Sequence, residues 1–454
     1  MDSNSVSRRK FIGVAGGVAA GAAIAGPASA ATKKPAATKK PAAKKKPAAK
    51  KPAAAPAAVN KPGTGVVNYW NHFTAAAERA GFESVTKGFK AASPNIDLKV
   101  ETIQNPDWMT KYINAVMSKS GPDALMVTQG RLADMSRIGG LVDLTARTKA
   151  WPDFTDNPAT VNNALALNGY QYAIPVFAFI DWGYYRADFF AAKGIKKVPT
   201  TLEEFRLAAI EMTDPSKKIY GFGLRGGAGG GGFVTKLLHA FNGPIYDAKT
   251  RKATLELDAA VDALRYWVRL GTKDKCIPPT AAGDGYAQFM GSFKAGGTAM
   301  ILHHTGSYVE ITTPLKAEIE VKTFNFPKGP KAEMTNISPL GNGLFKGTTN
   351  PDAGFEWISY WSSKKAQIDF LQATGYWPTA TGATADPFIK NTPAFRTAEN
   401  ALKIGWTSYT FPGLENWEIN TILPNVQKAL NETITPEQAA RNIWTELRDI
   451  TDTK

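Results

Sequence analysis

The stretch PDALMVTQG, residues 122–130, decides the fold. Its continuous apolar run is bounded by turn residues, which is typical of a strand covered on both faces in a parallel sheet. Upstream, apolar spacing predicts strands over 66–69 and 96–100, and helices over 82–89 and 109–117. This alternation of strands and helices predicts an α/β lobe with a mostly parallel sheet flanked by helices.

The rest of the body is less regular. GYQYAIPVFAFIDWGYYRADFF, residues 169–190, is apolar and aromatic and is too long for one strand. A helix is expected to begin after Thr201, because threonine can cap a helix and Glu203 and Glu204 would fill its first turn. Further helices are expected over 257–270, 286–293, 355–370 and 436–450, and a strand at TAMILHH, residues 298–304. A body of roughly 390 residues exceeds one ordinary core, which predicts two lobes.

The first 62 residues have the composition of an export signal followed by a linker. Arg8, Arg9 and Lys10 precede an uncharged run that ends in small residues at Ala30, which predicts a twin-arginine signal peptide over 1–30. The alternative is a transmembrane anchor, disfavoured by five glycines in the run. Residues 31–62, rich in Lys, Pro and Ala, cannot bury a core and are expected to be a disordered linker.

The net charge of +15 lies mostly in that linker. Residues 31–61 hold ten lysines and no acid, and residues 1–30 add +2, which leaves only +3 for residues 62–454. A near-neutral body is not expected to bind nucleic acid. The basic linker is instead expected on an anionic envelope surface. Cys276 is the single cysteine, so no intramolecular disulfide forms. Because no cysteine stands at the end of the apolar run, a lipid anchor is not expected, and a free periplasmic protein is.

Three strand ends combine aromatic and planar polar side chains: Trp70–His72, Thr128–Arg131 and Leu302–Tyr308. Open α/β sheets bind ligands beyond the carboxyl ends of their strands, so these segments predict a binding cleft. The glycine-rich LRGGAGGGGF, residues 224–233, lacks the Gly-Lys-Ser/Thr ending of a phosphate loop, and its glycines do not fit a dinucleotide fingerprint. A flexible loop that a ligand can approach is expected there.

Four separated segments carry a family resemblance. PDALMVTQGRLADMSRIGGLVDLT, GYQYAIPVFAFIDWGYYRADFF, FMGSFKAGGTAMILHHTGSY and PLGNGLFKGTTNPDAGFEWISYWSSKKAQIDFLQATGYWPT follow one another in the family's order and span almost all of 64–454. They resemble the large extracellular solute-binding proteins of bacterial ABC importers, family 1, whose best-known members bind sugars. The chain departs from the family pattern at Arg186, Leu202 and Tyr308, and the last departure leaves the ligand open.

The resemblance implies a two-lobe, type II periplasmic-binding-protein fold. The first lobe would comprise 64–178 and 341–377, and the second 181–337 and 380–454, with hinges near Phe179–Asp181 and Ser338–Gly341. It also implies a monomeric periplasmic receptor without cofactor or catalytic activity. Such a receptor would capture a sugar or polyol and deliver it to a permease.

A sugar site needs aromatic rings for C–H faces and planar polar groups for hydroxyls. The expected ligand contacts are Trp70, His72, Gln129, Arg131, Asp181, Trp182, Arg225, His304 and Tyr308, with Asn342, Trp377, Trp406 and Trp417 as weaker candidates. Each tryptophan has a packing alternative, and one of His303 and His304 is expected to be structural.

Two other functions stay open. The histidines and arginines among these candidates also suit an anionic ligand, such as a uronate, an organic acid or a phosphorylated polyol. An exported glycan-active enzyme would need two facing carboxylates, and only Asp181 is well placed for that role. No metal site is expected, because no clear cluster of His and Tyr ligands is present.

Overall fold

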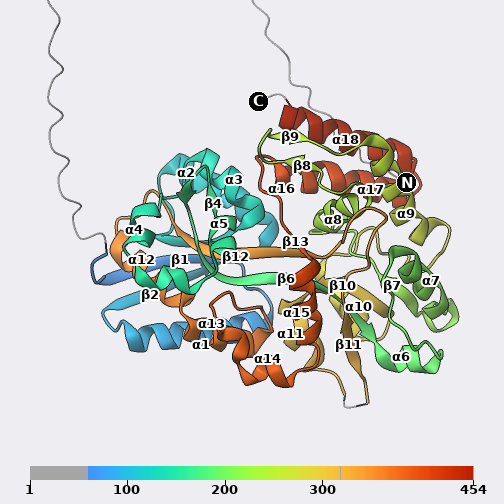
Figure 1. The fold of residues 1–454 in the computed structure, drawn as a ribbon, viewed down its shortest axis with the longest axis horizontal. Helices are drawn as coiled ribbons and strands as arrows, with labels where there is room; N and C mark the ends of the chain where they lie inside the picture. Colours follow the sequence, from blue (N-terminus) through green and yellow to red (C-terminus); the bar gives the residue numbers. More distant parts are fainter. Residues whose placement is uncertain (1–59, 317, 453–454) are drawn as a thin grey trace, which may run out of the picture. The chain divides into compact units, whose positions relative to one another are not determined.

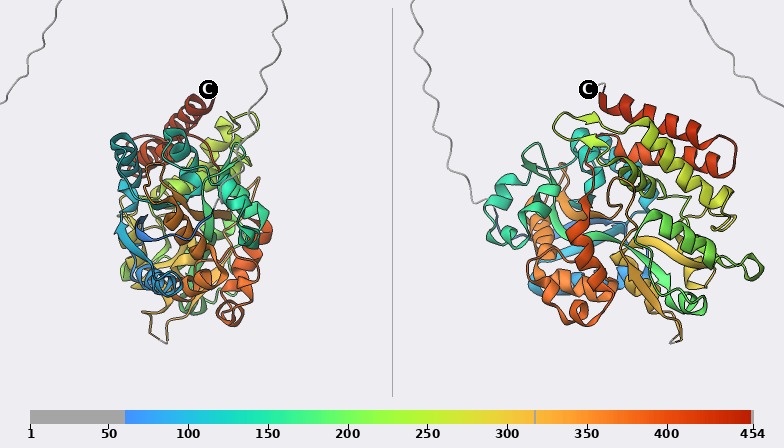
Figure 2. Two further views of the ribbon diagram at one scale, coloured as in Figure 1. Left: turned by 90° about the vertical axis from the view of Figure 1, so that its left-hand side faces the viewer. Right: turned by 45° about the vertical axis from the view of Figure 1, so that its right-hand side comes forward.

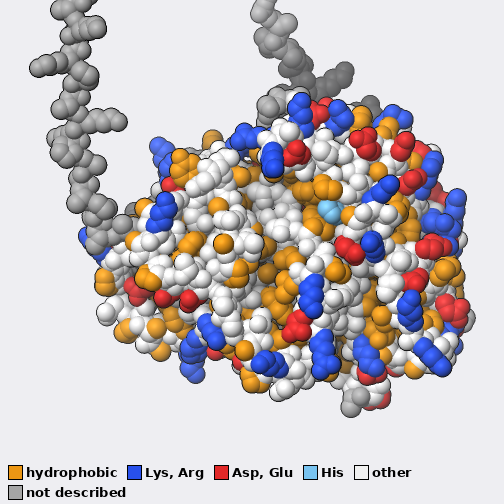
Figure 3. All heavy atoms as spheres, in the orientation of Figure 1, with side chains coloured by type: hydrophobic (Ala, Val, Ile, Leu, Met, Phe, Trp, Pro, Cys, Tyr) orange, Lys and Arg blue, Asp and Glu red, His pale blue; other side chains and the backbone are white. Residues whose placement is uncertain are grey.

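The computed structural model describes residues 60–316 and 318–452 (Figure 1). The predicted signal peptide, and the predicted linker up to residue 59, lie outside the described residues. Figure 3 shows basic and acidic side chains interspersed over one face of the body. No helix among the described residues is both long enough and apolar enough to span a bilayer.

The first lobe has the predicted alternation. Strand β1 (Gly65–Asn71) pairs in parallel with β2 (Ile96–Thr102) and with β3 (Ala124–Thr128), and the first four residues of β3 are fully buried. Helices α1 (Ala76–Ala92) and α2 (Trp108–Ser118) connect these strands. The prediction from the apolar run at 122–130 is therefore confirmed.

The aromatic stretch 169–190 contains one long strand, β6 (Ile174–Arg186), of 13 residues. As expected, the whole stretch is more than one strand, because β5 (Tyr170–Gln171) precedes β6 and helix α6 (Ala187–Ala192) follows it. Strand β6 is long because it serves both lobes. Its first half pairs antiparallel with β12 (Asn336–Leu344). Its second half pairs antiparallel with β10 (Thr298–His304) and β11 (Val321–Phe324). The two predicted hinge segments thus lie on neighbouring strands, with Phe179 opposite Ser338.

The main sheet has the strand order β2-β1-β3-β12-β6-β10-β7, with β11 on β6 and β13 (Trp406–Thr407) on β12. Strand β7 (Tyr220–Gly223) pairs in parallel with β10. Parallel strands therefore lie toward both ends of this order, and the antiparallel pairs gather around β6 and β12. The small strands are β4 (Ala166–Leu167), β5 (Tyr170–Gln171), β8 (Tyr246–Asp247) and β9 (Lys252–Ala253).

Helices cover both faces of the strands (Figures 1 and 2). As predicted, α7 (Leu202–Met212) begins after Thr201, whose hydroxyl accepts the Glu204 N–H while the Glu204 carboxylate accepts the Thr201 N–H. The helix expected over 355–370 is two helices, because Ser363 ends the first and caps the second. The remaining bounds are α3 (Gln129–Ile138), α4 (Thr145–Lys149), α5 (Ala159–Ala164), α6 (Ala187–Ala192), α8 (Gly231–Asn242), α9 (Leu257–Thr272), α10 (Tyr286–Lys294), α11 (Tyr308–Thr312), α12 (Pro351–Ser362), α13 (Lys364–Thr374), α14 (Pro387–Asn391), α15 (Phe395–Ile404), α16 (Leu414–Trp417), α17 (Leu423–Leu430) and α18 (Pro436–Asp452).

Each lobe has its own apolar core. The first is built around Trp357 and Trp361 of α12, and the second around Phe205 and Trp267. A third cluster lies along the second half of β6, where Trp182 packs with residues of α10 and α15. The fold is therefore an α/β fold with two lobes joined through β6 and β12.

Candidate functional site

The candidate site is a cleft lined by residues of both lobes. Two cavities of about 290 and 540 Å³ share eight lining residues and so form one continuous cleft. The shared residues are Thr128, Gly130, Phe179, Arg225, His303, His304, Leu414 and Glu418. We call the smaller cavity, which also contains Asp181 and Trp406, the inner part, and the larger one, which also contains His72 and Arg131, the outer part.

A buried ion pair lies in the inner part. Asp181, on β6, is only 3% exposed and lies between Lys236 of α8 and the backbone of β12. The Lys236 Nζ lies 2.9 and 2.7 Å from the two carboxylate oxygens of Asp181, and the Asn336 N–H donates to the same carboxylate at 3.2 Å. Burial raises the pKa of Asp181, and Lys236 acts in the opposite direction. The pair presents both a donor and an acceptor to the cleft.

Trp406 and Tyr409 form an aromatic wall of the inner part. The Trp406 ring stacks on His239, with ring centroids 4.0 Å apart and 13° between the planes. His239 Nδ1 lies 2.6 Å from the Tyr409 hydroxyl, and burial lowers the pKa of His239 to about 4. A neutral imidazole therefore stacks on one face of the Trp406 ring, which itself lines the inner part of the cleft.

In the outer part an ion pair joins the two lobes. Arg131 on α3 donates from Nη2 to Oε1 of Glu415 on α16 at 2.6 Å, and from Nε to both carboxylate oxygens at 2.8 Å. Its Nη2 also donates to the Asn105 side chain at 2.9 Å. Helix α3 begins at Gln129, directly after β3, and Arg131 in its first turn reaches Glu415 of the second lobe.

Three histidines of the cleft are uncharged at neutral pH. Burial lowers the pKa of His72 to about 3 and holds those of His303 and His304 well below the usual range. His304 Nδ1 accepts the Gly306 N–H at 3.2 Å, and His303 Nδ1 lies 3.1 Å from the Ser307 hydroxyl. Because the Nδ1 of His303 and the Nδ1 of His304 are engaged within the chain, the Nε2 of each ring is the nitrogen that remains for a hydroxyl group of a ligand.

Two acids of the cleft have no basic hydrogen-bond partner among the described residues. Glu418 accepts the Thr235 hydroxyl at 2.7 Å, and burial raises its pKa to about 7. Glu78 accepts the Tyr376 hydroxyl at 2.8 Å and two backbone N–H groups at the start of α1, and burial raises its pKa as well.

The structure brings five of the predicted contacts together in this cleft: His72, Arg131, Asp181, Arg225 and His304. His303, expected to be the alternative to His304, lines the cleft as well, and so does the weaker candidate Trp406. Sequence reasoning missed Glu78, Phe179, Lys236, Tyr286, Tyr376, Tyr409 and Glu418. The only signal among them was Phe179, which lies in the predicted hinge.

Six predicted contacts lie elsewhere, so direct ligand contact is not supported for them. Trp70 is buried in the first core and packs under Lys111, and the Gln129 side chain donates to the Ser408 carbonyl. Trp182 follows Asp181 in a strand and so lies on the opposite face, in the third core cluster. Tyr308 packs against Trp182 and Phe395.

The two weaker candidates in this group are also structural. Asn342, fully buried in β12, accepts the Tyr69 hydroxyl at 2.7 Å. Trp377 is buried next to Phe395, and its carbonyl accepts the Ala178 N–H. The further candidate Trp417 is buried and donates to the Ile443 carbonyl. Among residues 60–316 and 318–452, no three His, Cys, Asp or Glu side chains come close enough to hold a metal ion.

The sequence and the fold both match known proteins. The profile of the family described as bacterial extracellular solute-binding protein matches residues 75–368. The erythritol/L-threitol-binding protein of Mycolicibacterium smegmatis is 24% identical over 320 residues, 63% of this chain and 61% of that protein. The mannitol-binding protein of Pseudomonas aeruginosa is 26% identical over 235 residues, 48% of this chain and 50% of that protein. The chain thus spans between half and about three fifths of the length of these curated relatives.

Among solved structures, an ABC substrate-binding protein of Listeria monocytogenes in complex with cycloalternan has the same fold. The TM-score is 0.77 at 19% identity, over 86% of this chain and 99% of the other.

Proposed function

The chain belongs to the family of bacterial extracellular solute-binding proteins, and we propose that it captures a small carbohydrate or polyol between its lobes and delivers it to an ABC permease. The observation that carries this proposal is the cleft, whose lining comes from both lobes. A solute that touches both walls stabilises the closed arrangement over the open one, which is how such a receptor signals that it is loaded. The family and the fold are those of binding proteins rather than enzymes.

The chemistry of the cleft supports a polyhydroxylated solute. Trp406 and Tyr409 supply apolar faces, and the neutral imidazoles supply ring nitrogens for hydrogen bonds to hydroxyl groups. The ion pair of Asp181 and Lys236 adds charged partners for hydroxyl groups. The polyols named for the two curated relatives support the same ligand class.

The lobes and the location complete the proposal. We infer lobe boundaries at 64–178 with 341–377 and at 181–337 with 380–454, and a hinge where Phe179 and Ser338 face each other across β6 and β12. The signal peptide predicted over 1–30 would send a monomeric receptor to the periplasm. The basic linker over 31–62 would hold it near anionic lipid or cell-wall polymer.

Isothermal titration calorimetry with erythritol, L-threitol, mannitol and maltose tests the proposal. At least one of these solutes is expected to bind, and Trp406→Ala is expected to weaken its binding about tenfold through loss of ring stacking. Tyr170→Ala, at an exposed aromatic residue outside the cleft, is the control and should not change the affinity. If both variants lose the same affinity, the effect of Trp406→Ala is not specific, and Trp406 is not a ligand contact.

A further inference from the structure

Arg225 differs from the other cations of the cleft in having no acidic partner. Arg131 is paired with Glu415, and Lys236 is paired with Asp181. Among the described residues, no carboxylate makes an ion pair or a hydrogen bond with Arg225, although it lines both parts of the cleft. A cation left unpaired in a partly buried position is costly unless a ligand supplies the counter-charge.

The surroundings of Arg225 hold its guanidinium in place while leaving its terminal nitrogens unbonded. Its Nε donates to the Ala228 carbonyl at 2.8 Å, and the group lies 5.4 Å from the centroid of the Tyr286 ring. The Tyr286 hydroxyl donates to Glu310, which fixes the ring. Neither terminal nitrogen of Arg225 makes a hydrogen bond to the described part of the chain, so both stay available to a ligand.

The glycine-rich loop explains how the chain folds closely around this side chain. Gly229 has φ +85°, and a Cβ there would lie 2.2 Å from Arg225 Nη2. The loop is tied down by the Gly226 and Gly227 N–H groups, which donate to the carbonyls of Ala281 and Asp284. Residues 226–230 therefore hold Arg225 where it lines both parts of the cleft.

The acids of the same cleft do not offset this charge. Burial lowers the pKa of Arg225 to about 10, so the guanidinium is still charged at neutral pH. Burial raises the pKa of Glu78 and brings that of Glu418 to about 7, so both acids favour the neutral form more than usual. The neutral histidines beside Arg225 add no negative charge.

We propose that Arg225 binds the anionic group of the solute, so that the receptor takes an acidic sugar or acidic polyol carrying a carboxylate or a phosphate. This inference rests on the proposed function and narrows its ligand class. The two free terminal nitrogens of a guanidinium match two oxygens of either anion in a bidentate arrangement. The solute hydroxyls would then extend along the remaining wall of the cleft.

Calorimetry at pH 7.5 with three groups of probes tests this inference. Glucuronate and gluconate supply the carboxylate, glucose 6-phosphate and glycerol 3-phosphate supply the phosphate, and glucose, sorbitol and glycerol are the neutral counterparts. An acidic probe is expected to bind at least tenfold more tightly than its neutral counterpart. Arg225→Met should remove that preference, and Arg225→Lys should restore part of it, because lysine keeps the charge but loses the fork.

Arg265→Gln is the matched control, because Arg265 is paired with Glu437 on the exposed surface. It should leave every affinity unchanged. If neutral solutes bind the wild type and Arg225→Met with equal affinity and no acidic probe binds, the inference is overturned and the proposed function stands. Absence of binding by all three groups of probes and by the neutral panel above would overturn both. The group that binds, carboxylate or phosphate, identifies the anion.

Discussion

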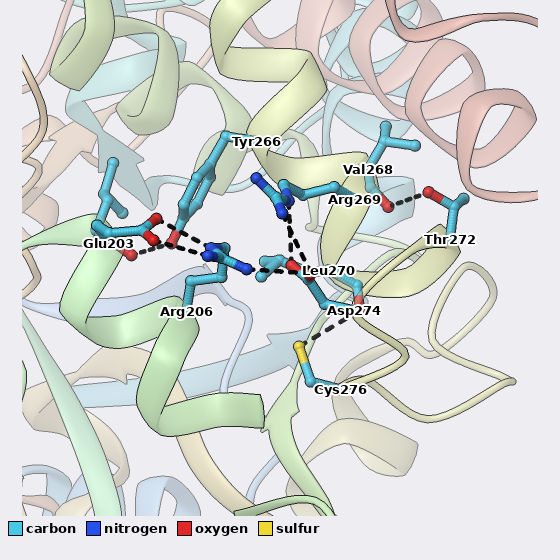
Figure 4. Close-up of polar contacts among 10 residues, drawn as sticks. Glu203, Arg206, Tyr266, Val268, Arg269, Leu270, Thr272, Asp274 and Cys276 are labelled. Carbon is cyan, nitrogen blue, oxygen red and sulfur yellow. Dashed lines mark hydrogen bonds and ion pairs between the residues drawn. The ribbon is translucent and has the colours of Figure 1, made fainter. Parts of the chain in front are cut away.

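Arg206 and Arg225 belong to the same lobe and have opposite surroundings. Arg206 donates to both oxygens of Glu203, at 2.9 and 2.7 Å, and to Asp274 at 3.1 Å, as Figure 4 shows. Its side chain is 13% exposed, and the hydrogen bonds that it donates to Glu203 raise its pKa. Arg225 has one bond to a carbonyl, and burial lowers its pKa to about 10.

This difference separates charge that serves the fold from charge that is available to a ligand. Around Arg206 every cation has a carboxylate, and Asp274 pairs with Arg269 as well. The charges in this network are paired with one another, so they are not available to bind a solute. The guanidinium of Arg225 keeps unused donors inside a cleft, and removing it should affect binding rather than stability.

The largest effect should come from opening the network around Arg206. Asp274→Asn leaves two arginines without their shared carboxylate, so we expect the free energy of unfolding to fall by about 3–5 kcal/mol. Urea unfolding followed by circular dichroism measures this change. Asp262→Asn, which breaks the exposed ion pair with Arg265, is the control, with an expected change below about 1 kcal/mol. Equal changes in both variants would show that the network contributes no more than a surface pair.

An intermediate, pH-dependent effect is expected at Glu418. Its pKa in the folded protein is about 7 and its ordinary value is 4.5, so the folded state binds the proton more tightly than the unfolded state. Stability is therefore lost as the pH rises from 4.5 through 7. Glu418→Gln removes the loss, and its oxygen can still accept the Thr235 hydroxyl.

Urea unfolding at two pH values measures this effect. Glu418→Gln should be more stable than the wild type by about 1–3 kcal/mol at pH 8 and equally stable at pH 4.5. A gain of the same size at both pH values would contradict the assignment, because an uncharged packing effect does not titrate.

Local signals were enough to predict most of the elements. Thr201 predicted the start of helix α7, because a capping box is formed within four residues. The apolar run at 124–127 predicted the buried strand β3. The stretch 169–190 was correctly expected to exceed one strand, but local length rules could not predict that β6 alone continues for 13 residues from one lobe into the other. That continuation depends on β10 and β12, which lie more than a hundred residues downstream.

The site was predicted only in part, for a related reason. The family resemblance implied that the region around residue 181 crosses between lobes, but strand alternation decides that Asp181 faces the cleft and Trp182 the core. Arg131 was predicted as a ligand contact, yet its partner Glu415 is 284 residues away and no local pattern reveals it. Aromatic residues at strand ends do not show their direction, and Trp70 and Tyr308 proved to be packing residues.

The smallest effect is the most direct test of the comparison. Arg225→Met removes a charge that has no acidic partner in the described chain, and the methionine side chain occupies similar space beside Tyr286. We expect the free energy of unfolding to change by less than about 1 kcal/mol. The expected sign is a small stabilisation, because an unpaired charge no longer has to be desolvated. Thermal unfolding without ligand measures it. A loss of unfolding free energy as large as that of Asp274→Asn would mean that Arg225 stabilises the fold as Arg206 does. The distinction between a structural and a ligand-binding arginine would then fail.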